Sequence, residues 1–393
     1  MSARTFTAAD RRARLGRRHR LAERGTDVTA VTEDLVVLHA TDPATVYLSV
    51  AARLASPSID AVASALYEER SVARILAMRR TLFIVPVAHL PVVERSSTDA
   101  VAVVERQRLE GFLADSGIDD PTAWLAEAAT EVIEALDGGG AQARQITALV
   151  PRLATKIPMG AGTKWAATAG ATSRVLGVLA NEGVLIRGQP AGQWTGRQYT
   201  WHLRRRWLGE SEPAPDSVTA EAASTELVRR WLRTFGPAAF DDLKWWTGWR
   251  VRQLRAAVAD LDVVEVDLDG RPGLVLGDDL GDDPTPEPWV ALLPSLDPTP
   301  MGWKERDWYL GPHRGPLFDR SGNIGPTVWA DGRIVGGWSQ RPDGEIVTRL
   351  LEDDVDSGTR DRIDAEVSRL QAVLGDTVVK PSFPTPLQRE LSA

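Results

Sequence analysis

The sequence contains no cysteine, which excludes disulfide bonds, thiolate metal sites and cysteine nucleophiles. Its five histidines are scattered, and their spacing is not that of metal ligands. No apolar run is long enough to cross a membrane, and the arginine-rich N-terminal segment lacks the apolar core of a secretory signal. We therefore expect a cytoplasmic protein that binds no metal, needs no cofactor and does not enter a membrane.

The chain also lacks a positive net charge. Its formal net charge is −8, which argues against a uniformly basic nucleic-acid binder but allows a local basic surface. Residues 1–30 hold eight arginines against three acidic residues, and residues 8–24 are expected to form a basic helix. Two interpretations of this helix stay open: a solvent-exposed charged face, or phosphate contacts that include Arg17 and Arg18.

What the chain has instead is a recurring order of short helices followed by strands. At 393 residues it is too long for one ordinary core, so several domains are expected. The recurring order predicts winged-helix units at residues 1–97, 98–208 and 218–285. Within the first unit we expect a short helix around residues 71–78, before a strand.

From residue 286 the pattern changes to short apolar strands and tight hairpins, such as the one that Asp331 and Gly332 indicate. Residues 359–374 have the pattern of an amphipathic helix that ends at Gly375. We expect residues 286–393 to form a small β-barrel-like domain with one covering helix. The fold class predicted for the chain is therefore α+β, with three tandem winged-helix units followed by this domain.

Residues 38–43, Leu-His-Ala-Thr-Asp-Pro, close one apolar run and open another. Asp42 before Pro43 favours a helix start, because the carboxylate caps free backbone N–H groups and proline at the first helical position removes no needed donor. His39 and Thr41 then lie on the short connection that enters the helix, where functional side chains are often placed. A capped turn without chemistry is the competing interpretation.

Three further segments, which follow this motif along the chain, have sequences that are informative when they are taken together with it. They are residues 79–86 (Arg-Arg-Thr-Leu-Phe-Ile-Val-Pro), residues 235–248 (Phe-Gly-Pro to Trp-Thr-Gly), and residues 293–298 with 325–336. Together the four segments resemble the winged-helix DNA glycosylases of the AlkZ and YcaQ type, over nearly the whole chain.

The resemblance implies removal of alkylated or crosslinked purines from double-stranded DNA, which the winged helices wrap. It places the catalytic triplet in the first unit, where the family has Gln-aliphatic-Gln or Gln-aliphatic-Asp and this chain has His39, Ala40 and Thr41. Both family glutamines are thus replaced, and the family's strand histidine is replaced by Phe83. We expect a nucleoid-associated monomer whose partner is duplex DNA with a damaged base.

Hydrolysis of an N-glycosidic bond builds positive charge on the sugar, and an N7-alkylated purine, being cationic already, leaves without a general acid. The enzyme then needs chiefly a held and activated water. We hypothesise that a neutral His39 near its free pKa accepts the water proton and that Thr41 orients the water. Asp42 is a further candidate, as a stabiliser of the sugar cation. No Schiff-base lysine lies at the motif, so a monofunctional glycosylase is expected.

The predicted DNA contacts are basic side chains in and beside the expected helix-strand units, together with one threonine and one tryptophan. Trp194, in the tip of the second unit's wing, either enters a groove as an apolar wedge or packs against its own protein. Lys304 and Arg306 either contact a DNA phosphate or form surface salt bridges with neighbouring acidic residues. The set is Arg17, Arg18, Arg79, Arg80, Thr81, Trp194, Arg197, Arg204, Arg205, Lys304 and Arg306.

The competing function is that of a non-catalytic DNA-binding protein, a transcription regulator or a lesion sensor. Loss of both family glutamines favours it. A typical regulator has one reader helix in each subunit and dimerises on paired half-sites. Three units in tandem in one chain fit wrapping of the duplex better than operator reading.

Overall fold

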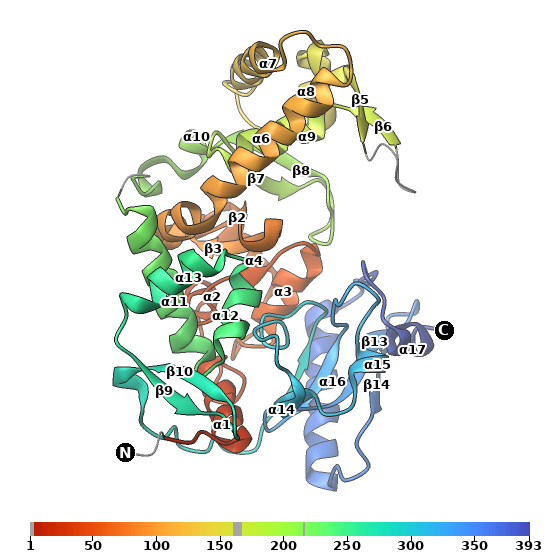
Figure 1. Ribbon diagram of the computed structural model, residues 1–393. Coiled ribbons are helices and arrows are strands. Elements are labelled where there is room, and N and C mark those ends of the chain that lie inside the picture. The colour runs from red at the N-terminus through yellow and green to blue at the C-terminus, as the bar shows by residue number, and fades with distance from the viewer. Residues whose placement is uncertain (1–3, 160–166, 215–216) are drawn as a thin grey trace.

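The computed structural model describes residues 4–159, 167–214 and 217–393, and it combines helices with several antiparallel sheets. In Figure 1 the second unit, with α6 to α9, stands at one end of the molecule, and the C-terminal sheet lies at the other end beside α3. Most helices of the first and third units lie between these two ends, whereas the third unit's hairpin lies at the same end as the C-terminal sheet. No helix among the described residues has the length and apolar character needed to cross a membrane.

The central part of the first unit has three helices and a three-stranded sheet, with α1 (Ala8–Arg18) before it in the chain and α5 (Leu90–Val93) after it. The helices are α2 (Val28–Asp34), α3 (Pro43–Ala51) and α4 (Ile59–Tyr67). The antiparallel sheet has the order β1-β3-β2, from β1 (Leu38–His39), β3 (Leu82–Pro86) and β2 (Val72–Leu76).

The expected helix at 71–78 is wrong, because these residues form β2. The strand pairs along its full length with β3, from Val72 opposite Pro86 to Leu76 opposite Leu82. Its first four residues are buried. Pairing with a strand that follows a sharp turn therefore overrides the helical pattern that the local sequence suggested.

The second unit has its own core. Its helices are α6 (Asp99–Ala114), α7 (Pro121–Ala135), α8 (Ala143–Leu149) and α9 (Thr172–Asn181). Its sheet has the order β4-β8-β7, from β4 (Ala141–Gln142), β8 (Tyr199–Leu203) and β7 (Leu185–Pro190). A separate hairpin is made by β5 (Lys156–Met159) and β6 (Ala167–Gly170).

The third unit has three helices and one hairpin. They are α11 (Ala220–Phe235), α12 (Phe240–Thr247), α13 (Val251–Ala259), β9 (Val263–Asp267) and β10 (Pro272–Leu276). One apolar cluster runs through this unit, the first unit and the C-terminal part, and includes Val85, Trp231 and Leu293. The three predicted winged-helix boundaries remain predictions.

The C-terminal part is an open sheet, which corrects the expected barrel. Its order is β11-β12-β13-β14, from β11 (Val290–Leu293), β12 (Thr327–Ala330), β13 (Arg333–Gln340) and β14 (Ile346–Leu350). Helix α16 (Ser357–Leu374) contacts β11, and α17 (Pro386–Leu391) contacts β13. Because helices cover this sheet, its apolar side chains are buried without the closure that a barrel requires.

Candidate functional site

The backbone of the His-Ala-Thr motif is held by the first unit's sheet. His39 in β1 pairs with Phe83 in β3, and the backbone N–H of Ala40 donates to the carbonyl oxygen of Leu82 at 2.8 Å. Of the triplet, Ala40 and Thr41 are among the lining residues of the cleft described below, whereas His39, whose ring packs against Phe83, is not. The sheet therefore fixes the backbone of the triplet beside that cleft.

His39 is half-buried and has no hydrogen-bond partner at Nδ1, which lies out of contact with solvent. Its ring meets the ring of Phe83 edge-on, with centroids 5.7 Å apart. Burial, and then the positive charge of Arg79, lower the pKa of His39 from 6.5 to about 4. The expectation of a pKa near the free value is corrected: the imidazole is neutral at physiological pH, and it is a weaker base than free histidine.

Thr41 is exposed and lines a cleft of about 610 Å³, here called the Thr41 cleft. The opposite wall comes from the second unit, through α8, α9, β7 and β8. Three arginines line the cleft: Arg144, Arg187 and Arg197. No aspartate or glutamate is among its described lining residues, although the chain as a whole is acidic. This arrangement favours a polyanion beside the motif.

Asp42 is the N-cap of α3, as the sequence predicted. Its Oδ1 accepts a hydrogen bond from the backbone N–H of Ala44 at 3.2 Å, and Pro43 occupies the first turn. Asp42 is buried and α3 is buried over its whole length, so the helix start is held inside the protein.

Replacing Asp42 by alanine is expected to lower the free energy of unfolding by about 1 kcal/mol, because a backbone donor at the start of α3 loses its acceptor. Asp42→Asn keeps a capping oxygen and is expected to unfold like the wild type. Urea denaturation of both variants measures the difference. Equal destabilisation by the two would show that the negative charge, and not the cap, supports α3.

The turn between β2 and β3 carries three predicted contact residues. Arg79 and Arg80 both adopt the left-handed region, with φ of 56° and 59°, which is strained for residues other than glycine. The Arg79 guanidinium lies over the Trp245 ring, 4.4 Å from its centroid, and Arg80 forms an ion pair of 2.5 Å with Glu105. Thr81 is half-buried. Arg79 therefore stands on an aromatic ring and acts on the charge state of His39.

The tip of the second unit's hairpin is packed against other parts of the protein. The Trp194 ring lies 4.9 Å from that of Tyr47 in α3. Arg197, one residue beyond the tip, donates to the Ser382 hydroxyl of the C-terminal part. The packed interpretation of Trp194 is the one observed, and in this conformation the ring is not free to act as a wedge in a groove.

Several predicted DNA contacts are instead buried in the protein or paired with its own carboxylates. Arg204 is buried and pairs with Glu94 and with Glu212, the latter at 2.8 Å. Arg306 is also buried, with its guanidinium over the Trp245 ring. The prediction that Arg204 and Arg306 contact DNA phosphates is therefore corrected, because both side chains are buried. Of the other members, Arg205 is exposed, whereas the exposed Lys304 pairs with Asp241 at 2.8 Å.

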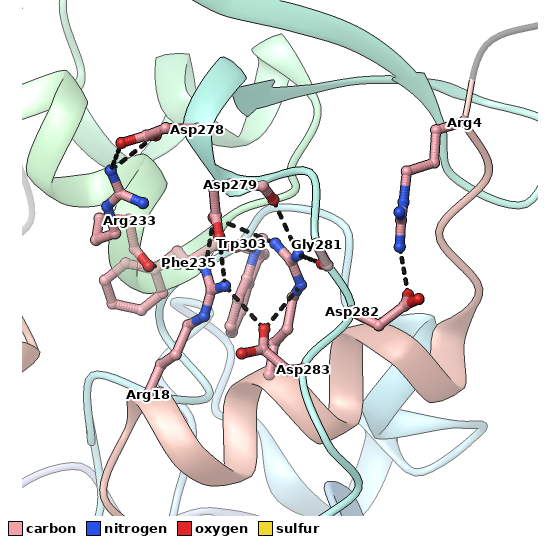
Figure 2. Close-up of polar contacts among 11 residues, drawn as sticks. Arg4, Arg18, Arg233, Phe235, Asp278, Asp279, Gly281, Asp282, Asp283 and Trp303 are labelled. Atoms are coloured by element: carbon pink, nitrogen blue, oxygen red, sulfur yellow. Dashed lines mark hydrogen bonds and ion pairs between the residues drawn. The ribbon is translucent and has the colours of Figure 1, made fainter.

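Helix α1 (Ala8–Arg18) is basic, but Arg14, Arg17 and Arg18 pair with acidic residues, and Arg11 and Arg12 contact Trp308. Arg18 binds Asp279 and Asp283, each at 2.8 Å, as Figure 2 shows. Arg14 on the same helix also pairs with Asp279, at 3.2 Å. Arg17 is 3.6 Å from Glu23. The phosphate interpretation of Arg18 is therefore corrected: its charge is neutralised within the protein and ties α1 to the segment after β10.

Sequence reasoning missed two arginines and a tyrosine that face the motif. Arg144 lies on α8, Arg187 on β7 and Tyr199 on β8, and all three line the Thr41 cleft. Each is more than 100 residues from Thr41 in the chain, so no local spacing relates them to the motif. The only available signal was the expected wing after residue 187. Among the described residues no group of histidines and carboxylates is arranged to hold a metal ion.

Comparisons with known proteins agree with this architecture. A family model described as DNA glycosylase AlkZ-like matches residues 32–373. An interstrand DNA cross-link repair glycosylase of Streptomyces sahachiroi is 30% identical over 191 residues, which are 46% of this chain and 49% of that protein. The match therefore spans about half the length of this curated relative. The solved structure of Streptomyces sahachiroi DNA glycosylase AlkZ has a TM-score of 0.72 at 22% identity, over 96% of this chain and 99% of that one, which shows a shared fold.

Proposed function

The chain belongs to the AlkZ-like DNA glycosylase family, and from this premise we propose that it hydrolyses the N-glycosidic bond of an alkylated or crosslinked base in duplex DNA. The observation that carries the proposal is the Thr41 cleft, in which three arginines and no described carboxylate face the motif. A cleft of this charge attracts the phosphodiester backbone. It brings the sugar of a bound nucleotide close to the residues that correspond to the family's catalytic triplet.

In the proposed reaction, a base that already carries positive charge departs with the bonding electrons of the C–N bond. Positive charge then develops on the sugar, and a water molecule adds to the anomeric carbon and loses a proton. His39 is neutral because of its lowered pKa, so it is able to accept that proton. Thr41 is exposed at the cleft, where its hydroxyl is able to hold the water by a hydrogen bond.

A pKa of about 4 makes His39 a weak base, and this restricts the substrates it suits. A neutral leaving group would need both protonation and a strong nucleophile. A cationic alkylated purine needs neither, because its departure precedes or accompanies attack by a poorly activated water. The low basicity of His39 therefore favours a substrate whose base is already charged.

Asp42 is assigned a structural role within this proposal. Its carboxylate is occupied by the cap of α3, and it is buried beneath the motif. A monofunctional reaction fits the cleft, since no lysine occurs among its described lining residues to form a Schiff base with the sugar.

The experiment that tests the function is base release by the wild-type protein from a panel of duplexes. The panel holds N7-alkylguanine, N3-alkyladenine, deaminated bases or an interstrand crosslink in one sequence context. We expect release from the duplexes with cationic alkylated purines and none from those with deaminated bases, because only the former leave without a general acid. No release from any duplex, together with tight binding of undamaged DNA, would instead favour the non-catalytic regulator or lesion sensor.

A further inference from the structure

Arg187 stands at the junction of two clefts. It lies on β7 opposite Trp201 of β8, and its guanidinium covers the Trp201 ring 4.5 Å from the centroid. It lines the Thr41 cleft and also a second cleft of about 270 Å³, here called the Glu105 cleft. Ser173, exposed in the first turn of α9, lines both clefts as well. The two side chains thus connect the motif to a groove that continues along the second unit.

No carboxylate among the described residues neutralises Arg187. It forms no ion pair with any of them, and the charged or ionisable groups close enough to influence its pKa are Arg74 and Tyr199. Burial, and then the like charge of Arg74, lower the pKa of Arg187 to about 10. Glu105, which gives the second cleft its name, is already shared between Arg80 at 2.5 Å and Arg108 at 3.6 Å.

Arg74 adds a second uncompensated cation behind this position. It is 3% exposed and has no carboxylate partner among the described residues; the polar groups around it are the hydroxyls of Tyr47, Tyr67 and Tyr199, which raise the pKa of Arg74. Its guanidinium lies 4.5 Å from the centroid of the Tyr199 ring, and Tyr199 is itself a wall of the Thr41 cleft. A buried cation without an anion is costly, so this pair of arginines is poised for a negative charge from outside the chain.

Other buried arginines of the protein show the contrast. Arg14 pairs with Asp279, Arg53 with Asp297, and Arg204 with Glu94. The chain supplies carboxylates to these three, whereas Arg11 and Arg306 are buried over tryptophan rings without an ion pair among the described residues. At Arg187 it supplies instead an aromatic ring, a second arginine and the start of a helix whose N-cap residue, Ala171, has no side-chain cap. Free N–H groups at a helix start favour an anion such as a phosphate.

We propose that Arg187, with Arg74 behind it and Ser173 beside it, binds one phosphodiester group of the DNA backbone at the junction of the two clefts. This inference rests on the proposed function and names the contact that positions the substrate. A phosphate held there places the adjoining nucleotide in the Thr41 cleft and directs the rest of that strand along the Glu105 cleft. Arg187 is thus a positioning residue, and it does not take part in the chemical step.

The test is the salt dependence of binding to an undamaged duplex, followed by fluorescence anisotropy, for Arg187→Gln, Arg187→Lys and the control Arg320→Gln. Arg320 is exposed in the C-terminal part, lines neither cleft and carries the same charge. Arg187→Gln is expected to bind at least about tenfold more weakly, and its plot of log affinity against log salt is expected to be shallower by about one. Arg187→Lys keeps the slope and loses part of the affinity, because lysine lacks the forked donor.

A second measurement identifies the phosphate. Single phosphates around an N7-alkylguanine are replaced, one at a time, by neutral methylphosphonates. At the phosphate that Arg187 contacts, the methylphosphonate is expected to weaken duplex binding by the wild type. The same replacement is expected not to weaken binding by Arg187→Gln any further, which would show that Arg187 and this phosphate interact directly. A salt slope for Arg187→Gln equal to that of Arg320→Gln, or losses that add at every position, would overturn the contact. Base release by wild type is scored separately: coupling without release refutes the reaction alone, and release without coupling refutes this contact alone.

Discussion

Replacing Asp297 by alanine is expected to lower the free energy of unfolding by about 3–5 kcal/mol, because it strands the buried charge of Arg53. The two side chains have no solvent exposure and form a two-pronged ion pair, with Arg53 Nη2 2.7 Å and Nη1 2.8 Å from the two carboxylate oxygens. Arg53 also donates to the hydroxyl of Thr299 at 2.7 Å and to the carbonyl of His19 at 2.9 Å. The pair joins the chain after α3 to the C-terminal part.

Urea denaturation provides the measurement, and two further variants make it decisive. Glu305→Ala breaks an exposed pair with Arg271 and is expected to unfold like the wild type, because solvent screens that pair. A double variant, Arg53→Met with Asp297→Leu, removes both charges and is expected to recover most of the stability that Asp297→Ala loses. A double variant as unstable as the single one would show that the volume and hydrogen bonds of the pair, and not the unpaired charge, set the loss.

Replacing His39 by alanine is expected to slow base release from an N7-alkylguanine duplex by about 100-fold or more under single-turnover conditions. The variant removes the proposed proton acceptor and leaves the arginines of the Thr41 cleft in place, so duplex affinity is expected to stay the same. His89→Ala is the matched control, since His89 is also half-buried, also has a pKa lowered to about 4, and lies outside the 38–43 motif, in the segment that follows β3. Equal release by His39→Ala and His89→Ala would refute the role of His39.

The pH dependence gives an independent check on the same group. The neutral form of His39 is the active form, and its pKa is lowered to about 4, so the rate is expected to be flat from about pH 8 down to about pH 5.5. A histidine with its free pKa would already lose half of its neutral form at about pH 6.5. Below about pH 6.5 the histidines of the unfolded chain take up protons, whereas those with a lowered pKa in the folded protein do not, so the free energy of unfolding falls as the pH drops from about 6.5 towards 4. Folding is therefore monitored in parallel with the rate.

Local features of the fold followed from the sequence because neighbouring residues alone decide them. Asp42 and Pro43 start a helix wherever their backbone leads into one, and the structure has this cap. The hairpin at Asp331 and Gly332 depends on a turn with positive φ at both residues, which is observed. The order of four motifs was enough to indicate the family, which the match over residues 32–373 shows.

The tertiary structure alone decided how far each element extends and what covers it. The 71–78 segment became a strand because β3 pairs with it, and the C-terminal strands stayed an open sheet because α16 and α17 supply the cover that closure would have provided. The sequence pattern of neighbouring residues does not show which strand pairs with a segment or which helices cover a sheet. The first unit, the third unit and the C-terminal part also share an apolar cluster that contains Val85, Trp231 and Leu293, three residues that are distant in the chain.

The same division holds at the site, for an electrostatic reason. The sequence located His39 and Thr41, because Asp42 and Pro43 mark the start of the helix that directly follows them. The charge state of His39 and the fate of each arginine depend on long-range neighbours. Arg18 and Arg204 form ion pairs with carboxylates of the protein, whereas Arg187 lies over an aromatic ring and beside another arginine. Since an unpaired and a paired guanidinium read alike in a sequence, only the folded chain distinguishes the arginines that are free to bind DNA.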